Sequence, residues 1–205
     1  MSKKFWWQWS SFFVGLIVMS LGITMTIKGN VIGTSPWDVF HIGMFKQFGF
    51  TIGTWSILTG LLIIVATSLY LKRWPQLATW LNMLLIGTFI DIFNWLLPDA
   101  QRFLWEITYF AAGFVIMSTG CALYIAASLG AGPRDTIMMI IASKGYSVKT
   151  GRMVMEVFAA LFGWLLGGPV GVGTVILALG TGYIIQPALF FFKGKLEKII
   201  GEPLT

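Results

Sequence analysis

The chain has 205 residues, of which 57% are hydrophobic and only 11% are charged, with a formal net charge of +6. Soluble domains carry about a quarter charged residues, so this composition excludes a soluble globular protein and indicates an integral membrane protein. A single cysteine (Cys121) and a single histidine (His41) exclude an intramolecular disulfide and any metal site built from several such side chains.

Six apolar stretches follow one another along the chain, each long enough to cross a bilayer as a helix, which takes about 20 residues. The first follows Lys3 and Lys4 without a cleavage site of small residues, so we interpret it as a membrane span rather than a signal peptide. The stretches leave no room for a soluble domain and predict a single all-α polytopic membrane domain over residues 1–205. They cover residues 7–28, 53–71, 77–98, 106–127, 150–168 and 172–192.

Two shorter segments, 36–48 and 133–145, lie between these stretches. Each has about 13 residues, which is too short to span a membrane and typical of a re-entrant or an interfacial helix. Each begins with proline, which costs no hydrogen bond at the first position of a helix. We predict two short re-entrant helices, and the sequence leaves open whether they dip into the bilayer or lie along its surface.

The segment Gly33–Asp38, with the pattern Gly-x-x-Pro-x-Asp, recurs as Gly130–Asp135. One half of the chain is therefore a diverged copy of the other, with repeat one at 7–98 and repeat two at 106–192. Each repeat holds three spans, an odd number, so the second copy is expected to be upside down relative to the first, an inverted 3+3 arrangement. Upstream of the two segments, Gly15, Met19, Ser20, Gly22 and Ile27 recur as Gly113, Met117, Ser118, Gly120 and Ile125.

The basic residues are distributed unevenly over the two sides of this arrangement. With the N-terminus in the cytoplasm, eleven Lys and Arg residues fall on the inner side and three, Lys28, Lys46 and Arg102, on the outer side. This asymmetry follows the positive-inside rule and predicts that both termini are cytoplasmic. The basic excess is thus topological, and we predict no binding of nucleic acid.

The repeated turns combine helix caps with the features of a ligand site. Ser35 before the proline and Asp38 three residues later form a capping box, which is sufficient to explain both. Helix N-termini inside a bilayer also present free N–H groups to an anion or carboxylate, and Arg134, at the position that matches Trp37, adds a bidentate donor. The two interpretations are compatible. The predicted ligand-binding residues are Ser35, Trp37, Asp38, Arg134 and Asp135.

Two further carboxylates lie within predicted spans and are candidates for coupling transport to a proton or a cation. Asp91 lies in the third span, from which it can instead reach the interface or Lys28. Glu156 lies in the fifth span, four residues after Arg152, a spacing that favours a local ion pair. His41, on the first short helix, can titrate near neutral pH, although a side chain hydrated by water is the expected state.

Glycines line several predicted spans at helical spacing. Gly15 with Gly22, Gly113 with Gly120, and Gly163 with Gly167 each lie on one helix face. Such faces favour close packing of helices within the chain, and they can also form the seam of a homodimer.

The sequence resembles the YczE/YyaS/YitT family of bacterial membrane proteins. The resemblance rests on the segment Gly33–Val39 and on Gly53-Thr54-Trp55-Ser56, and it extends over essentially the whole chain. The compact length is similar to that of YczE-type members, which lack the soluble C-terminal domain of longer YitT-type members. The resemblance implies a multi-pass protein of the bacterial inner membrane, and it implies no substrate.

The internal symmetry favours a small secondary transporter or permease-like protein for a small organic anion or zwitterion, with its site between the two short helices. Because few polar residues lie within the spans, the alternative is a non-transporting accessory or substrate-capture protein that acts with a partner complex. The chain contains no nucleophile elbow, Walker loop or HExxH motif. We therefore predict neither an enzyme nor a cofactor.

Overall fold

The computed structural model describes residues 3–130 and 132–204. This part of the chain is helical and contains no strand, so the all-α prediction is confirmed. The helices begin and end close to the predicted positions because prolines, glycines and the limits of the apolar runs mark them. They are α1 (Lys3–Lys28), the 3₁₀ helix η1 (Asn30–Ile32), α2 (Pro36–Phe48), α3 (Ile52–Leu71), α4 (Leu77–Leu96), α5 (Phe103–Ala126), α6 (Pro133–Ser143), α7 (Val148–Leu165) and α8 (Val172–Ile200).

Five of the described helices are long and apolar enough to cross a membrane, namely α1, α3, α4, α5 and α8. Helix α7 has 18 residues, among them Lys149, Arg152 and Glu156, and it is not one of these five. The short helices α2 and α6 have 13 and 11 residues. A helical membrane protein with several spans is thus confirmed, whereas the sixth span stays a prediction.

Helices α1 and α5 form the most extensive helix pair of the fold. Glycines allow their backbones to approach each other: a Cβ atom added at Gly113 would lie 2.7 Å from the carbonyl oxygen of Gly22, and one added at Gly120 would lie 2.8 Å from that of Gly15. Because the lower-numbered glycine of α1 faces the higher-numbered glycine of α5, the two helices run antiparallel.

The glycine faces are therefore occupied by contacts within the chain. On α7, a Cβ atom added at Gly163 would lie 2.6 Å from the Cα atom of Phe40 in α2, while Gly167 lies in the turn beyond α7. The prediction that these faces can form a homodimer seam is not supported, since their small residues serve intramolecular packing.

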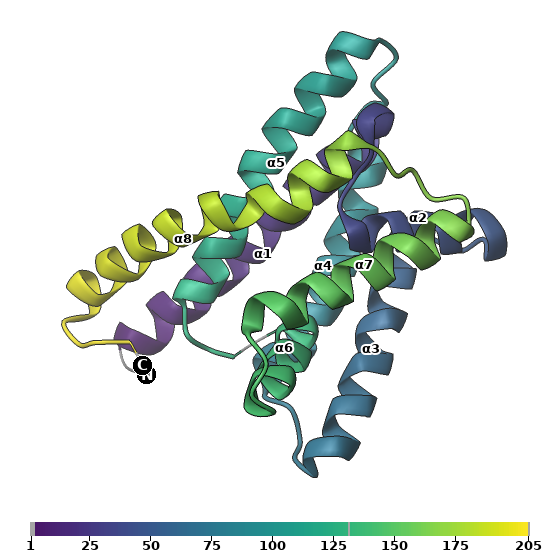
Figure 1. The fold of residues 1–205 in the computed structure, drawn as a ribbon. Helices are drawn as coiled ribbons and strands as arrows, with labels where there is room; N and C mark the ends of the chain where they lie inside the picture. The colour runs from purple at the N-terminus through teal and green to yellow at the C-terminus, as the bar shows by residue number, and fades with distance from the viewer. Residues whose placement is uncertain (1–2, 131, 205) are drawn as a thin grey trace.

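Helices α4 and α8 pack directly on this pair, whereas α2, α3, α6 and α7 lie together to one side of it and pack mainly on other helices (Figure 1). Helix α4 packs on α1 and α8 packs on α5, while α7 packs on α2 and α6 packs on α3. Helices α3 and α4 meet closely, since a Cβ atom added at Gly87 would lie 2.6 Å from the carbonyl oxygen of Gly53. Helices α7 and α8, in contrast, pack mainly on α2 and α5 rather than on each other.

The start of α1 and the segment that follows α8 lie side by side at one end of the molecule (Figure 1). The Nζ atom of Lys4 lies 3.4 Å from the Oε2 atom of Glu202, and Leu204 is buried against α5 and α8. The N-terminal half of α1 and the C-terminal half of α8 therefore share one side of the fold.

Candidate functional site

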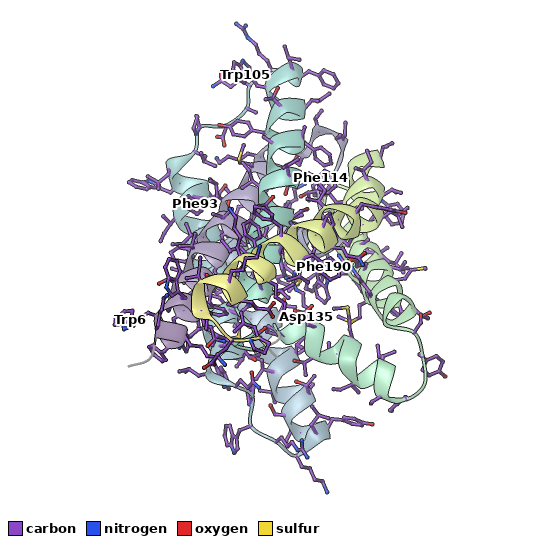
Figure 2. The ribbon with its side chains drawn as sticks, turned by 90° about the vertical axis from the view of Figure 1, so that its left-hand side faces the viewer. Trp6, Phe93, Trp105, Phe114, Asp135 and Phe190 are labelled. Carbon is purple, nitrogen blue, oxygen red and sulfur yellow. The ribbon has the colours of Figure 1, made fainter. Side chains whose placement is uncertain are left out.

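A cavity of about 340 Å³ lies in the middle of the helices, and α1 to α8 all contribute to its lining. Figure 2 shows Asp135 in this central part of the molecule, far from Trp6 and Trp105 at its extremities. Most of the lining is apolar, with side chains such as Met19, Ile23, Met83 and Ile86. Five charged residues also line the cavity, namely Asp38, Arg134, Asp135, Arg152 and Glu156.

The two repeated turns meet at this cavity. The guanidinium carbon of Arg134 lies 4.5 Å from the centre of the Trp37 ring, so the two residues at matching positions of the turns contact each other. Arg134 is half-buried, and among the described residues no carboxylate lies within ion-pair distance of it and no hydrogen bond holds it. The Trp37 face positions the guanidinium and leaves its N–H groups available.

The N-terminus of α2 has the Ser35 cap that the sequence predicts, but among the described residues Asp38 does not accept from the Ser35 backbone N–H, so the capping box is formed in part. Ser35 accepts a hydrogen bond from the backbone N–H of Asp38, and its hydroxyl donates to the Asp38 carboxylate. Only 3% of Asp38 is exposed, and its side chain nevertheless contributes to the cavity lining, which Ser35 does not. Ser35 thus acts as the cap, and Asp38 is both a cap residue and a wall of the cavity.

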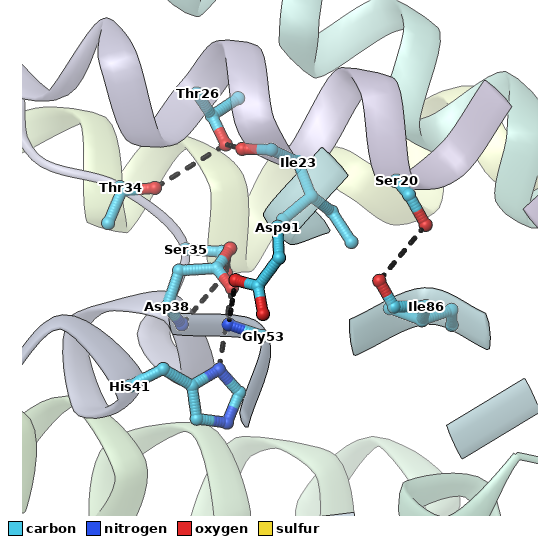
Figure 3. A network of polar contacts seen from close by, with 10 residues as sticks. All are labelled: Ser20, Ile23, Thr26, Thr34, Ser35, Asp38, His41, Gly53, Ile86 and Asp91. Atoms are coloured by element: carbon cyan, nitrogen blue, oxygen red, sulfur yellow. Dashed lines mark hydrogen bonds and ion pairs between the residues drawn. The ribbon is translucent and has the colours of Figure 1, made fainter. Parts of the chain in front are cut away.

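His41 lies one turn after Asp38, with Nδ1 at 3.7 Å from the Asp38 Oδ1 atom (Figure 3). The His41 side chain is fully buried, and neither ring nitrogen has a hydrogen-bond partner among the described residues. The expectation of a hydrated histidine is therefore wrong, because α2 is covered by α7 and the aromatic rings of Trp37 and Phe40 pack on the imidazole.

The second turn places Asp135 at the equivalent position of α6. Its Oδ2 atom accepts hydrogen bonds from the backbone N–H of Gly132 at 3.2 Å and from the hydroxyl of Tyr124 at 3.1 Å. Tyr124 lies in α5, so the carboxylate links the turn to the central helix pair. The sequence did not single out Tyr124; its place just upstream of the turn was the available signal.

Asn82 is a second residue that sequence reasoning missed. It lies in α4, lines the cavity and is only 5% exposed. Its Nδ2 group has no hydrogen-bond partner among the described residues. A buried donor without a partner costs free energy, and because Asn82 lines the cavity its Nδ2 group is available to a molecule bound there. The sequence feature that could have pointed to Asn82 is a polar amide side chain within the apolar run of the third predicted span.

The two coupling candidates take different positions. The Nε atom of Arg152 lies 2.8 Å from the Glu156 Oε1 atom, which confirms the predicted local ion pair, and Arg152 also donates to Thr181 of α8 at 2.9 Å. Both members of the pair line the cavity.

Asp91 does not line the cavity. Its carboxylate accepts a hydrogen bond from the backbone N–H of Gly53 at 2.8 Å (Figure 3). It also accepts one from the Thr51 hydroxyl, and so caps the start of α3. Lys28, which the sequence offered as its partner, pairs with Asp99 instead, at 2.5 Å. Asp91 therefore has a structural role at the α3–α4 contact.

The site offers charged and hydrogen-bonding groups but no cluster of metal ligands. Among residues 3–130 and 132–204, no group of three or more His, Cys, Asp or Glu side chains could hold a metal ion. The chemistry available to a bound molecule is therefore charge pairing with Arg134, Asp38 and Asp135, hydrogen bonding to Asn82, and apolar contact.

Comparison with known proteins finds relatives over most of the chain. A profile of the family of unknown function DUF6198 matches residues 6–189. The chain is 44% identical to the uncharacterized membrane protein YczE of Bacillus subtilis strain 168, over 89% of this chain and 85% of the relative. It is 26% identical to the uncharacterized protein YyaS of the same organism, over 84% and 88%, and 31% identical to an uncharacterized Haemophilus influenzae protein, over 83% and 78%. No solved structure matches the chain.

Proposed function

The chain belongs to the family of unknown function DUF6198, and on that premise we propose that it is a small secondary transporter or permease-like protein for a small organic anion or zwitterion. The observation that carries this proposal is the central cavity between the starts of α2 and α6, which gathers charged groups from both halves of the chain. Ionisable residues within a membrane are costly and mark substrate or ion pathways.

An inverted 3+3 repeat is part of this proposal. The correspondence of 7–98 with 106–192 makes α1 equivalent to α5, and these two helices run antiparallel, as an inversion requires. The contact between Gly22 and Gly113 has a counterpart in the contact between Gly15 and Gly120. Exchange of the two halves also converts the α2–α7 pair into α6–α3 and the α1–α4 pair into α5–α8, all of which pack together.

The departure from this symmetry supports transport. Helix α3 packs on α4, whereas the equivalent α7 and α8 pack mainly on other helices. Inverted-repeat transporters expose a central site alternately to the two sides by moving one part against the other. In our proposal the α7–α8 and α3–α4 contacts exchange their roles between two states of the cycle.

The proposed topology has six spans, with α7 as the sixth, two re-entrant helices and both termini in the cytoplasm of a bacterial cell. The Arg152–Glu156 pair supports α7 as a span, because paired charges lower the cost of burial in a membrane. The neighbouring positions of the two chain ends support an even number of crossings.

The inversion predicts that the C-terminal ends of the two short helices face opposite sides of the membrane. Lys46 lies in the last turn of α2, and Lys144 directly follows α6. We expect Lys46→Cys and Lys144→Cys, each in a Cys121→Ser background, to be labelled from opposite sides by an impermeant maleimide. Both positions are exposed, so no other part of the described chain covers either thiol. Labelling of both from the same side would refute the inverted arrangement.

Transport itself is tested with purified protein in sealed liposomes. We expect accumulation of at least one solute from a panel of labelled amino acids, organic acids and amines, and we expect protein-free vesicles to accumulate none. Absence of flux for the whole panel, together with specific co-purification of another membrane complex, would replace the transporter with an accessory role.

A further inference from the structure

We propose that the central cavity binds a zwitterionic solute of the amino-acid class, with its carboxylate on Arg134 and Asn82 and its ammonium group beside Asp38 and Asp135. This inference rests on the proposed function and names the substrate class of the same site. It follows from the groups that the cavity leaves without partners and from the sign of the charges around them.

The donors of the cavity are the first part of the argument. The Nδ2 group of Asn82 is buried and has no partner among the described residues. The guanidinium of Arg134 lies on the Trp37 ring and has no hydrogen bond within that part of the chain. Both side chains line one cavity. A carboxylate can accept from both, and guanidinium binds carboxylate in bidentate fashion.

The carboxylates of the cavity are the second part. Glu156 is paired with Arg152, so its charge is matched within the protein. Asp38 and Asp135 remain, with Arg134 as the one further cation among the residues that line the cavity. These two carboxylates and one guanidinium together carry a net negative charge, which disfavours a ligand whose only charged group is a carboxylate. An amine alone would leave Arg134 and Asn82 without an acceptor. A solute with both groups satisfies both sets.

The apolar lining and the size of the cavity define the rest of the solute. Met19, Met83, Met138 and Met155 contribute to the walls, and flexible thioethers adapt to different apolar shapes. A volume of about 340 Å³ is at the lower end of the range for small-molecule sites. We therefore infer an amino acid with an apolar side chain.

Cys121 provides the assay, because it is the only cysteine of the chain and lines the same cavity. The rate at which methyl methanethiosulfonate modifies Cys121 is measured in purified protein, with and without a small molecule that can occupy the cavity and so protect the thiol. Three series of such molecules are compared. Each series contains an amino acid (leucine, methionine or phenylalanine), the acid that lacks its amino group and the amine that lacks its carboxyl group. We expect at least one amino acid to protect Cys121, and its truncated analogues to bind about tenfold more weakly or worse, since each leaves buried polar groups unpaired.

Variants separate recognition from folding. Asn82→Leu removes the donor that has no partner, so the ligand-free protein should melt at the same temperature or higher, while protection by the amino acid weakens about tenfold. Asn94→Leu, at an exposed position of the same helix, is the matched control and should change neither. In Arg134→Gln, protection by the amino acid should be lost and protection by the amine retained.

The outcomes distinguish this inference from the proposed function. Protection by an acid or an amine as strong as that by its parent amino acid would overturn the zwitterion and leave a transporter of another class. Unchanged protection in Asn82→Leu would likewise overturn the assigned carboxylate site. Flux of a solute in liposomes without protection by any amino acid would contradict the inference alone, whereas absence of both would contradict the proposed function as well.

Discussion

Gly22→Ala and Gly113→Ala are each expected to destabilise the protein by about 3 kcal/mol, the upper end of the range for overpacked cores. The added Cβ atom at Gly22 would lie 2.6 Å from the Cα atom of Met117, and at Gly113 it would lie 2.7 Å from the carbonyl oxygen of Gly22. These neighbours are backbone atoms, so no side-chain rotation relieves the overlap, and α1 must move away from α5. Denaturant-induced unfolding in mixed micelles measures the change.

Gly182→Ala is the matched control for this prediction. Gly182 lies within α8, and an added Cβ atom would meet no atom within 4 Å. Its replacement should leave stability unchanged or raise it by up to about 1 kcal/mol, because alanine loses less backbone entropy in a helix. The Gly22→Ala/Gly113→Ala double variant should lose less stability than the sum of the two single losses, because the same separation of α1 from α5 relieves the overlap at both positions. Equal stability of Gly22→Ala and Gly182→Ala would contradict the close contact of α1 with α5.

Arg134→Gln is expected to destabilise the ligand-free protein by about 2 kcal/mol, less than the loss of one member of a buried ion pair, because no carboxylate of the described residues lies within ion-pair distance of Arg134. Without this guanidinium, the carboxylates of Asp38 and Asp135 share the cavity with no unpaired cation, because Arg152 is held by Glu156. Loss of the contact with the Trp37 ring adds a smaller term of about 1 kcal/mol. Thermal and denaturant unfolding of the purified variant test the prediction.

A second substitution that restores stability tests whether the loss in Arg134→Gln comes from uncompensated charge. In the Arg134→Gln background, Asp135→Asn should recover part of the lost stability, since it removes one uncompensated charge and keeps an oxygen that accepts from Gly132 and Tyr124. Arg102→Gln, at the exposed start of α5, controls for loss of an arginine and should have little effect. A failure of Asp135→Asn to rescue would indicate that Arg134 stabilises the fold through packing alone.

Several features of the site could be read from the sequence because they depend on neighbours a few residues apart. Ser35 and Asp38 are three residues apart and form the cap that this spacing allows. Arg152 and Glu156 are four residues apart on one helix face and form the expected ion pair. The repeat brought Trp37 and Arg134 to attention as matching positions, and they contact each other.

Other features depend on contacts between distant parts of the chain, and the sequence alone led to different expectations. Asp91 appeared as an isolated charge in a span, but it caps α3, whose start lies about 40 residues away along the chain. His41 appeared exposed to water on a short helix, but α7 covers that helix. No pattern of neighbouring residues in the sequence marks Asn82 or Tyr124 as part of a site. Only the packing of α4 and α5 brings the two side chains to one cavity.

The sequence by itself determined the membrane class, the helices, the two proline-initiated turns and the family, since hydropathy, capping residues and motifs act over one or two helical turns. The tertiary structure decided which glycine faces meet, which carboxylates serve as caps, and which donors remain unpaired in the cavity. The physical reason is that helix formation depends on local spacing, whereas a membrane cavity is assembled from single residues on many helices. Their pairing depends on how those helices cross.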